Sequence, residues 1–246
     1  MNRHRERNGM TNPDGDIVPA IHPSVIFAMD EPNSDGGLQY GRIGNRTREG
    51  LERDLILLHR AADGIVTASG SAATLVACLT FPAGAAVLHH TELYEGTRRM
   101  FESVLSRFGL TFISVDMTDV ASVEQAFRTH DISTVWMETP TNPTLRVLDI
   151  RSASIIAHHH DARVIVDTTM CSGIVQKPLM HGADMVVESL TKSINGHSDA
   201  LGGFVGTNSL ETGKQIRKLT QTTGCMLNPW ESWLIQRGLK TADVRM

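Results

Sequence analysis

The chain has few cysteines, and none of them follows a metal-binding or disulfide pattern. Its 246 residues include Cys78, Cys171 and Cys225, which are far apart and form no Cys-x-x-Cys pair. Small disulfide-rich domains and zinc sites need more cysteines at closer, regular spacing. We therefore expect reduced thiols and a cytoplasmic location.

Segments suited to membranes or nucleic acids are also missing. The N-terminal MNRHRERNG is polar and contains no apolar core for a signal peptide. The longest apolar stretch, residues 72–88, is interrupted by Thr80, Pro82 and Gly84, which predicts a helix, a turn and a strand instead of a membrane span. A net charge of −4 offers no broad positive surface. We expect neither a membrane nor a nucleic acid as partner.

Several common catalytic motifs do not occur either. The chain has no Gly-x-Gly-x-x-Gly, Gly-x-x-x-x-Gly-Lys-Ser/Thr, Gly-x-Ser-x-Gly or His-Glu-x-x-His sequence. Dinucleotide, nucleotide, serine-hydrolase and zinc-protease functions therefore lack their signatures. The run 158–160 is all histidine, but consecutive helical residues point in different directions and cannot converge on one ion. We expect no metal site.

What the chain does contain is an alternation of apolar strands and helical stretches. Strands are predicted for AAVLHH, LTFISVD, STVWME, ARVIVD, ADMVVES and GGFVGT, and helices for 97–108, 120–129 and 150–159. This order predicts an α/β domain with a mainly parallel sheet and helices on both faces. The last strand follows the previous one after a loop too short for a crossover helix, so we expect it to be antiparallel.

The most informative segment is Ser189-Leu190-Thr191-Lys192, directly after an apolar strand. Residues i and i+2 of an extended chain point the same way, so Ser189 and Thr191 can both donate to one phosphate. Lys192 can then reach a carbonyl on the same ligand. A phosphate-tethered aldehyde such as pyridoxal phosphate fits this pattern, although an exposed lysine after a strand is more often only a solvated residue.

A carboxylate ends another buried strand. Asp167 closes ARVIVD, a β-branched run typical of a buried parallel strand. Open α/β sheets bind ligands at the carboxyl ends of their strands. A carboxylate there can pair with a cationic ring nitrogen and keep it protonated. The alternative is that Asp167 only caps the next turn.

A helix start supplies the third element. Ser69-Gly70-Ser71 precedes a run of small residues that predicts a helix after the short strand GIVTA. The free backbone N–H groups of a helix N-terminus attract anions, and Gly70 allows close approach, so the Gly70 and Ser71 amides can bind a phosphate. A capped core helix without a ligand is the other interpretation.

Together these residues resemble the transsulfuration (Cys/Met metabolism) enzymes, a family that uses pyridoxal phosphate. The matching segments occur in order along nearly the whole chain. They are YGRIGNRT at 40–47, SGSAA at 69–73, LYEGT at 93–97, ETPTNPTLRVLDI at 138–150, VDTT at 166–169, ESLTKSINGHSD at 188–199 and RGLKTADVRM at 237–246. The resemblance implies the large domain of the fold type I pyridoxal-phosphate enzymes.

The resemblance also implies a role for each residue of the site. Lys192 would bond to the cofactor aldehyde and move protons, Asp167 would pair with the pyridine nitrogen, and Tyr94 would stack on the ring. The phosphate would be held by Gly70, Ser71, Ser189 and Thr191.

Residues 1–50 are expected to form an N-terminal arm, and residues 51–246 the cofactor-binding domain. In this family the arm crosses into the adjacent active site, so Tyr40 and Arg42 would complete the phosphate site of a neighbouring subunit. The resemblance therefore implies a homodimer or homotetramer. Asn142 would contact the cofactor or the substrate carboxylate, with Glu138 close by.

The sequence departs from the family pattern at three positions and at its end. Arg46 replaces a proline, Ser71 a methionine whose backbone binds phosphate, and Thr168 an asparagine. Family members continue beyond the position of Met246 into a small C-terminal domain that carries the arginine for the substrate carboxylate, and we expect this domain to be absent.

Two hypotheses follow. The first is an enzyme similar to cystathionine γ-synthase or γ-lyase, with a sulfur amino acid as substrate and elimination or replacement at Cβ or Cγ. The second is a catalytically incompetent fragment that keeps the fold and the cofactor site.

Overall fold

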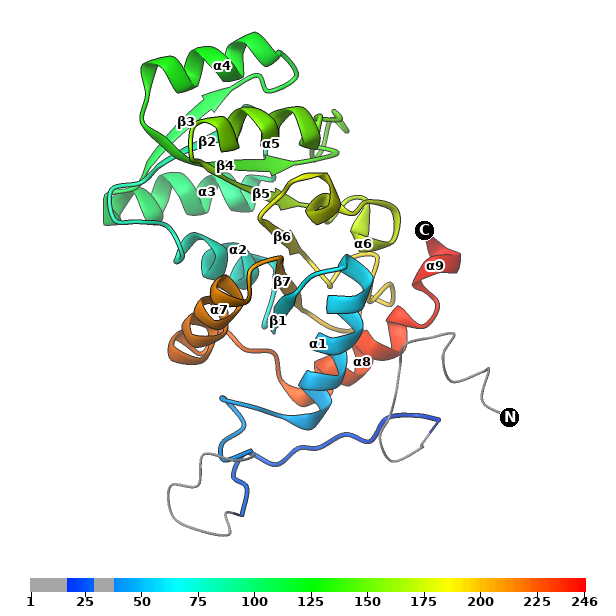
Figure 1. The fold of residues 1–246 in the computed structure, drawn as a ribbon. Helices are drawn as coiled ribbons and strands as arrows, with labels where there is room; N and C mark the ends of the chain where they lie inside the picture. Colours follow the sequence, from blue (N-terminus) through cyan, green and yellow to red (C-terminus); the bar gives the residue numbers. More distant parts are fainter. Residues whose placement is uncertain (1–16, 29–37) are drawn as a thin grey trace.

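The computed structural model describes residues 17–28 and 38–246 (Figure 1). Its described part contains a seven-stranded sheet with the order β1-β7-β6-β5-β4-β2-β3. The strands are β1 (Asp63–Thr67), β2 (Ala86–His90), β3 (Thr111–Val115), β4 (Ile132–Glu138), β5 (Arg163–Asp167), β6 (Met185–Glu188) and β7 (Gly203–Thr207).

Most of the sheet is parallel, as the sequence predicts. The strands from β3 through β2, β4 and β5 to β6 run in one direction, whereas β7 pairs antiparallel with both β6 and β1. The expectation of an antiparallel last strand is therefore confirmed. Only residues 189–202 connect β6 to β7, and that segment contains the turn that carries Lys192.

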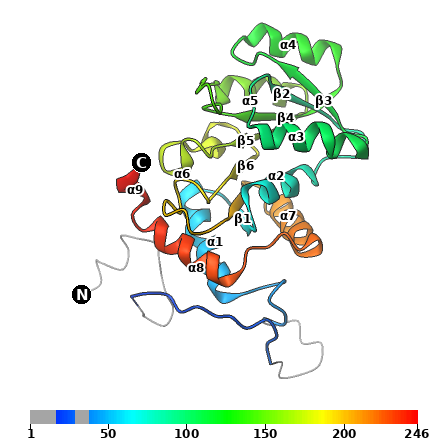
Figure 2. The same cartoon turned by 180° about the vertical axis from the view of Figure 1, so that it is seen from behind.

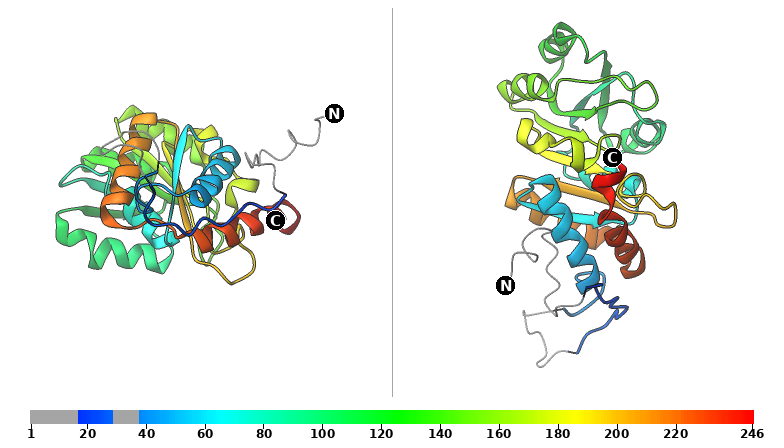
Figure 3. Two further views of the ribbon diagram at one scale, coloured as in Figure 1. Left: turned by 90° about the horizontal axis from the view of Figure 1, so that it is seen from below. Right: turned by 90° about the vertical axis from the view of Figure 1, so that its right-hand side faces the viewer.

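Helices cover both faces of the sheet (Figures 1 and 2). They are α1 (Arg46–His59), α2 (Gly70–Cys78), α3 (Glu95–Ser103), α4 (Val120–Thr129), α5 (Ile150–His159), α6 (Ser172–Val175), α7 (Leu210–Thr223), α8 (Pro229–Leu239) and α9 (Ala242–Arg245), with 3₁₀ turns at Leu105–Phe108 and Pro178–His181. The right-hand view of Figure 3 shows the sheet edge-on between these two layers.

The two layers enclose two hydrophobic clusters. One joins the sheet to α1, α4 and α5, and the other joins it to α2, α3 and α7. Strand side chains alternate between the clusters, since Val164 and Val166 belong to the first and Ile165 to the second. This period of two, with apolar residues on both faces, is what a buried parallel strand requires.

One predicted helix is divided in two. The sequence predicts a single helix at 97–108, but α3 begins at Glu95 and ends at Ser103, and a separate 3₁₀ turn follows. The Ser106 hydroxyl donates to the carbonyl oxygen of Glu102 at 2.6 Å. The α-helix ends before Val104, whose φ of −116° departs from the regular helical value.

Residues 17–28, the first described part of the expected N-terminal arm, run beside α8 and α1 (Figure 1). The Trp233 indole N–H donates to the Pro19 carbonyl at 2.9 Å, and the His22 N–H donates to the Thr47 hydroxyl at 2.8 Å. Residues 1–16 and 29–37 of the expected arm lie outside the described residues. Within the described ranges, no helix is both long and apolar enough to cross a membrane.

Candidate active site

The carboxyl ends of the parallel strands border a pocket of about 220 Å³. Eight of the predicted site residues line it: Gly70, Ser71, Tyr94, Asn142, Asp167, Ser189, Thr191 and Lys192. It is also lined by Ser69, Thr74, Gly96, Thr97, Met100, Glu138, Thr169, Met170 and Leu201. The structure thus gathers at one place residues that are up to about half the chain apart in sequence.

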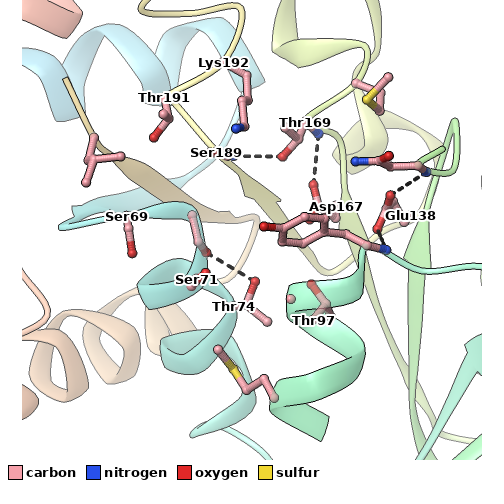
Figure 4. A pocket seen from close by; sticks show the side chains of 17 residues that line it. Ser69, Ser71, Thr74, Thr97, Glu138, Asp167, Thr169, Ser189, Thr191 and Lys192 are labelled. Atoms are coloured by element: carbon pink, nitrogen blue, oxygen red, sulfur yellow. Dashed lines mark hydrogen bonds between the residues drawn. The ribbon is translucent and has the colours of Figure 1, made fainter. Parts of the chain in front are cut away.

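The N-terminus of α2 forms one wall of this pocket (Figure 4). Ser69 caps the helix by accepting the Ala72 N–H at 3.1 Å, which leaves the Gly70 and Ser71 N–H groups without helical partners. A Cβ on Gly70 would lie 2.7 Å from the Ser189 Cβ and 2.8 Å from its Oγ. Only glycine lets α2 approach the Ser189 hydroxyl this closely, so amides and hydroxyl form one concave donor set for an anion.

Asp167 lies at the end of β5, opposite this helix N-terminus. It is 9% exposed, and its Oδ1 accepts the Thr169 N–H at 2.9 Å. Burial raises its pKa from the ordinary 3.8 to about 6. Among the described residues no arginine, lysine or histidine forms an ion pair with Asp167. Ionised Asp167 therefore lowers the stability of the folded chain, and a cationic N–H group bound in the pocket would offset this loss.

Sequence reasoning missed Thr169, which joins Asp167 to the phosphate side of the pocket. Its N–H donates to Asp167, and its hydroxyl oxygen accepts the Ser189 N–H at 2.9 Å (Figure 4). The available signal was its position two residues after Asp167, because alternate residues of an extended segment share one side.

Lys192 extends into the pocket from the turn after β6 (Figure 4). Within the described part of the chain its amine has no hydrogen-bond or ion-pair partner, so it is free to react with a ligand. Arg245 of α9 holds the turn by donating to the carbonyl oxygens of Ser193 and Ile194, the latter at 3.0 Å. It also donates to the Gly238 carbonyl at 2.8 Å. Nothing in the sequence pattern indicated this contact.

Tyr94 precedes α3, and 47% of its surface is exposed. Its ring passes close over Gly96, where a Cβ would lie 2.4 Å from the ring Cε1. Its N–H donates to Glu138 at 2.8 Å, and the Asn142 N–H donates to the other oxygen of Glu138 at 2.7 Å. Burial, reinforced by the charge of Asp167, raises the pKa of Glu138 from 4.5 to about 7.

Tyr40 and Arg42 lie outside the pocket. Tyr40 forms an isolated bridge with Ile26, and Arg42 donates to the Gln221 carbonyl at 2.7 Å. The Arg42 guanidinium also lies 5.5 Å from the centre of the Tyr40 ring. Both residues belong to a surface that does not contribute to this chain's own pocket, and their role in a neighbouring subunit stays a prediction.

The chemistry of the pocket fits pyridoxal phosphate. Backbone amides and hydroxyls face one end, as a phosphate requires, and a buried carboxylate without a cationic partner lies where a protonated pyridine nitrogen would offset its burial. A free primary amine can react with the aldehyde, and an aromatic ring can cover the cofactor ring. No group of three or more potential metal ligands is present among the described residues.

Comparisons with known proteins agree with this chemistry. The family model described as Cys/Met metabolism PLP-dependent enzyme matches residues 4–246. A cystathionine beta-lyase of Lactococcus lactis subsp. cremoris is 38% identical over 232 residues, which cover 94% of this chain and 61% of that protein. Human cystathionine gamma-lyase is 39% identical over 231 residues, or 94% of this chain and 57% of that protein.

Solved structures show the same fold. A cystathionine gamma-lyase of Lactobacillus plantarum complexed with L-serine has a TM-score of 0.88 at 38% identity, over 92% of this chain and 58% of that one. A cystathionine gamma synthase of Xanthomonas oryzae pv. oryzae in complex with cystathionine has a TM-score of 0.92 at 33% identity, over 97% of this chain and 62% of that one.

The chain belongs to the Cys/Met metabolism PLP-dependent enzyme family, and its fold is that of the fold type I enzymes. It spans about three fifths of the length of the relatives it matches. Family membership implies pyridoxal 5'-phosphate as cofactor and confirms the resemblance inferred from the sequence.

Proposed function

We propose that this chain is the cofactor-binding part of an enzyme that eliminates or replaces a group at Cβ or Cγ of a sulfur amino acid. Its membership of the Cys/Met metabolism PLP-dependent family supports this, as does the similarity to cystathionine lyases and synthases. The single observation that carries the proposal is the convergence of a free amine, an unpaired buried carboxylate and an anion cradle on one pocket.

Each group in the pocket has a distinct task in this proposal. Bound pyridoxal phosphate supplies an electron sink for the charge released when a bond at the substrate Cα breaks. Asp167 keeps the ring nitrogen protonated, and Thr169 holds Asp167 in place. Lys192 would hold the cofactor through its side-chain amine, and that amine would be placed to move protons at the substrate Cα and, for γ chemistry, at Cβ.

Positioning comes from the pocket walls. The phosphate is held by Gly70, Ser71, Ser189 and Thr191. Tyr94 covers one face of the cofactor ring, and Asn142 contacts the cofactor or the substrate carboxylate. These contacts would hold the reacting groups in one orientation, which lowers the entropic part of the barrier.

A second candidate is a chain that binds cofactor but does not turn substrate over. The observation in its favour is that no arginine lines the described pocket, whereas an α-carboxylate is best held by a bidentate arginine. In this version the cofactor site is complete, and the substrate site requires residues that the chain does not supply itself.

The first experiment is addition of pyridoxal phosphate to the purified chain, with Lys192→Ala as the control. We expect the visible absorption band of the lysine-bound cofactor in the wild type and none in the variant. Release of a 2-oxo acid from cystathionine would then support the enzyme, and a band without turnover would support the cofactor-binding fragment. A folded wild-type chain without any band would refute both.

We also propose a cytoplasmic homo-oligomer, a dimer or a tetramer. The location is supported by three unpaired cysteines. The assembly is supported by the placement of Tyr40 and Arg42 on a surface away from this chain's own pocket, where they are available to a neighbouring subunit.

A further inference from the structure

Glu138 occupies a position in the pocket that the tasks described above leave unused. It ends β4, is 4% exposed, and lies beside Asp167 in the register of β4 and β5. Figure 4 shows its carboxylate at the side of the pocket, with each oxygen accepting one hydrogen bond. These are the bonds from the Tyr94 N–H at 2.8 Å and the Asn142 N–H at 2.7 Å.

The two donors come from different loops. Tyr94 ends the segment between β2 and α3, whereas Asn142 lies in the segment between β4 and α5. Each of these residues lines the pocket. Tyr94 is 44 residues from Glu138 in the sequence, and Asn142 is 4 residues from it. Glu138 therefore connects two walls of the pocket that belong to separate parts of the chain.

Among the described residues, the Tyr94 and Asn142 N–H groups each donate to one acceptor, a carboxylate oxygen of Glu138. Tyr94 is the residue before α3 and has no side-chain cap hydrogen bond. Asn142 precedes Pro143, which has no N–H, so Glu138 takes the last backbone donor before the proline. Both oxygens of Glu138 act as acceptors here, and the bonds become charge-assisted, and therefore stronger, when the carboxyl group ionises above its pKa of about 7.

An outer carboxylate links the same two loops at the surface. Glu92 accepts the Thr141 hydroxyl at 3.3 Å and pairs with Arg146 at 3.2 Å, and its side chain is 29% exposed. Glu92 and the residues it contacts do not line the pocket, whereas Glu138 holds two residues that do. Comparing Glu92 with Glu138 therefore separates the effect of an exposed connection from that of a buried one.

We propose that Glu138 is a positioning residue that sets the orientation of Tyr94 and Asn142 over the cofactor. The inference rests on the proposed function, because it gives Glu138 the task of holding Tyr94, which would cover the cofactor ring, in a fixed position relative to Asn142. Glu138 need not touch cofactor or substrate, because it acts through the two backbone N–H groups.

The test compares Glu138→Gln with two controls. Glutamine keeps the shape but presents an NH₂ donor to one of the two N–H groups, which leaves that group unsatisfied. Glu92→Gln weakens the outer link between the same loops. Glu52→Gln matches the burial, since Glu52 is 4% exposed and accepts the Val66 N–H, but it lies on α1 outside the pocket.

The first readout needs no cofactor. Hydrogen exchange measured by mass spectrometry should be faster in the peptides containing Tyr94 and Asn142 for Glu138→Gln, by about tenfold, and unchanged there for Glu52→Gln. Unchanged exchange in a folded Glu138→Gln protein would overturn the inference, whatever the cofactor does.

The second readout reports ring orientation. With pyridoxal phosphate bound, the visible circular dichroism of the cofactor should change in Glu138→Gln, and cofactor affinity should fall about tenfold or more. Glu92→Gln should give a smaller change and Glu52→Gln none. A wild-type chain without any cofactor band would refute the proposed function and reduce Glu138 to a structural carboxylate. A wild-type band with an identical signal in Glu138→Gln would refute the positioning role alone.

Discussion

Asp167 should make the cofactor-free protein less stable than it could be at neutral pH. Its pKa is raised from 3.8 to about 6 by burial, so the ionised form is disfavoured in the folded state. Since one pKa unit corresponds to about 1.4 kcal/mol, ionised Asp167 costs about 3 kcal/mol of folding free energy. Replacement by asparagine, which keeps the shape and can still accept the Thr169 N–H, should recover that amount at a pH where Asp167 is fully ionised.

The cost depends on pH in a defined direction. Below about pH 3 Asp167 is protonated in both the folded and the unfolded chain and adds nothing. As the pH rises from about 4 to 6, the unfolded chain ionises first, and stability falls until both states are ionised. About half of the cost is present at pH 5 and all of it above pH 7. Glu138, with its pKa near 7, adds a second loss of the same sign.

Urea unfolding of wild type and Asp167→Asn, both free of cofactor, at pH 5 and pH 8 measures this effect. The variant should be more stable at both, by about 1.5 kcal/mol at pH 5 and about 3 kcal/mol at pH 8. Addition of pyridoxal phosphate should stabilise the wild type more than the variant, because only the carboxylate pairs with a cationic ring nitrogen. A variant no more stable than wild type at pH 8 would show that Asp167 is not desolvated in the apo protein.

Three further substitutions test the rest of the site. Gly70→Ala places a Cβ 2.7 Å from the Ser189 Cβ, so it should destabilise the fold by about 1–3 kcal/mol in thermal unfolding and weaken cofactor binding; unaltered affinity would argue against the anion cradle. Arg245→Gln removes the donors to two carbonyl oxygens of the turn that carries Lys192. Hydrogen exchange in residues 190–196 should become faster, because the turn loses about 1 kcal/mol of stabilisation per hydrogen bond. Unaltered exchange would show that the turn is stable without Arg245. Arg42→Ala should weaken cofactor retention in the assembled protein and leave the dissociated chain unaffected; equal retention in the assembly would contradict a role across subunits.

The sequence was sufficient for the fold and for most of the pocket. β-branched apolar runs such as ARVIVD favour buried strands, and their alternation with helices permits few arrangements other than a mainly parallel sheet. Residues at the ends of such strands must meet at the carboxyl edge. Asp167, Ser189 and Lys192 therefore share a pocket because each lies at or just after the end of a parallel strand, which the order of the elements predicts.

Other features depended on contacts between distant segments. Glu138 meets Tyr94 across 44 residues, and Arg245 reaches Ser193 across 52. No local pattern specifies such a pair, because a hydrogen bond between loops exists only after the sheet has fixed where each loop begins. The same holds for the unpaired state of Asp167, which is a property of its surroundings.

The sequence by itself determined the fold class, the family and the chemical types of the groups in the pocket, since these follow from local periodicity and residue identity. The tertiary structure alone decided which groups hold one another, how deeply the two carboxylates are buried, and that Tyr40 and Arg42 lie away from this chain's pocket. Burial and pairing are relations between segments, and they set the pKa values and orientations on which the proposed chemistry depends.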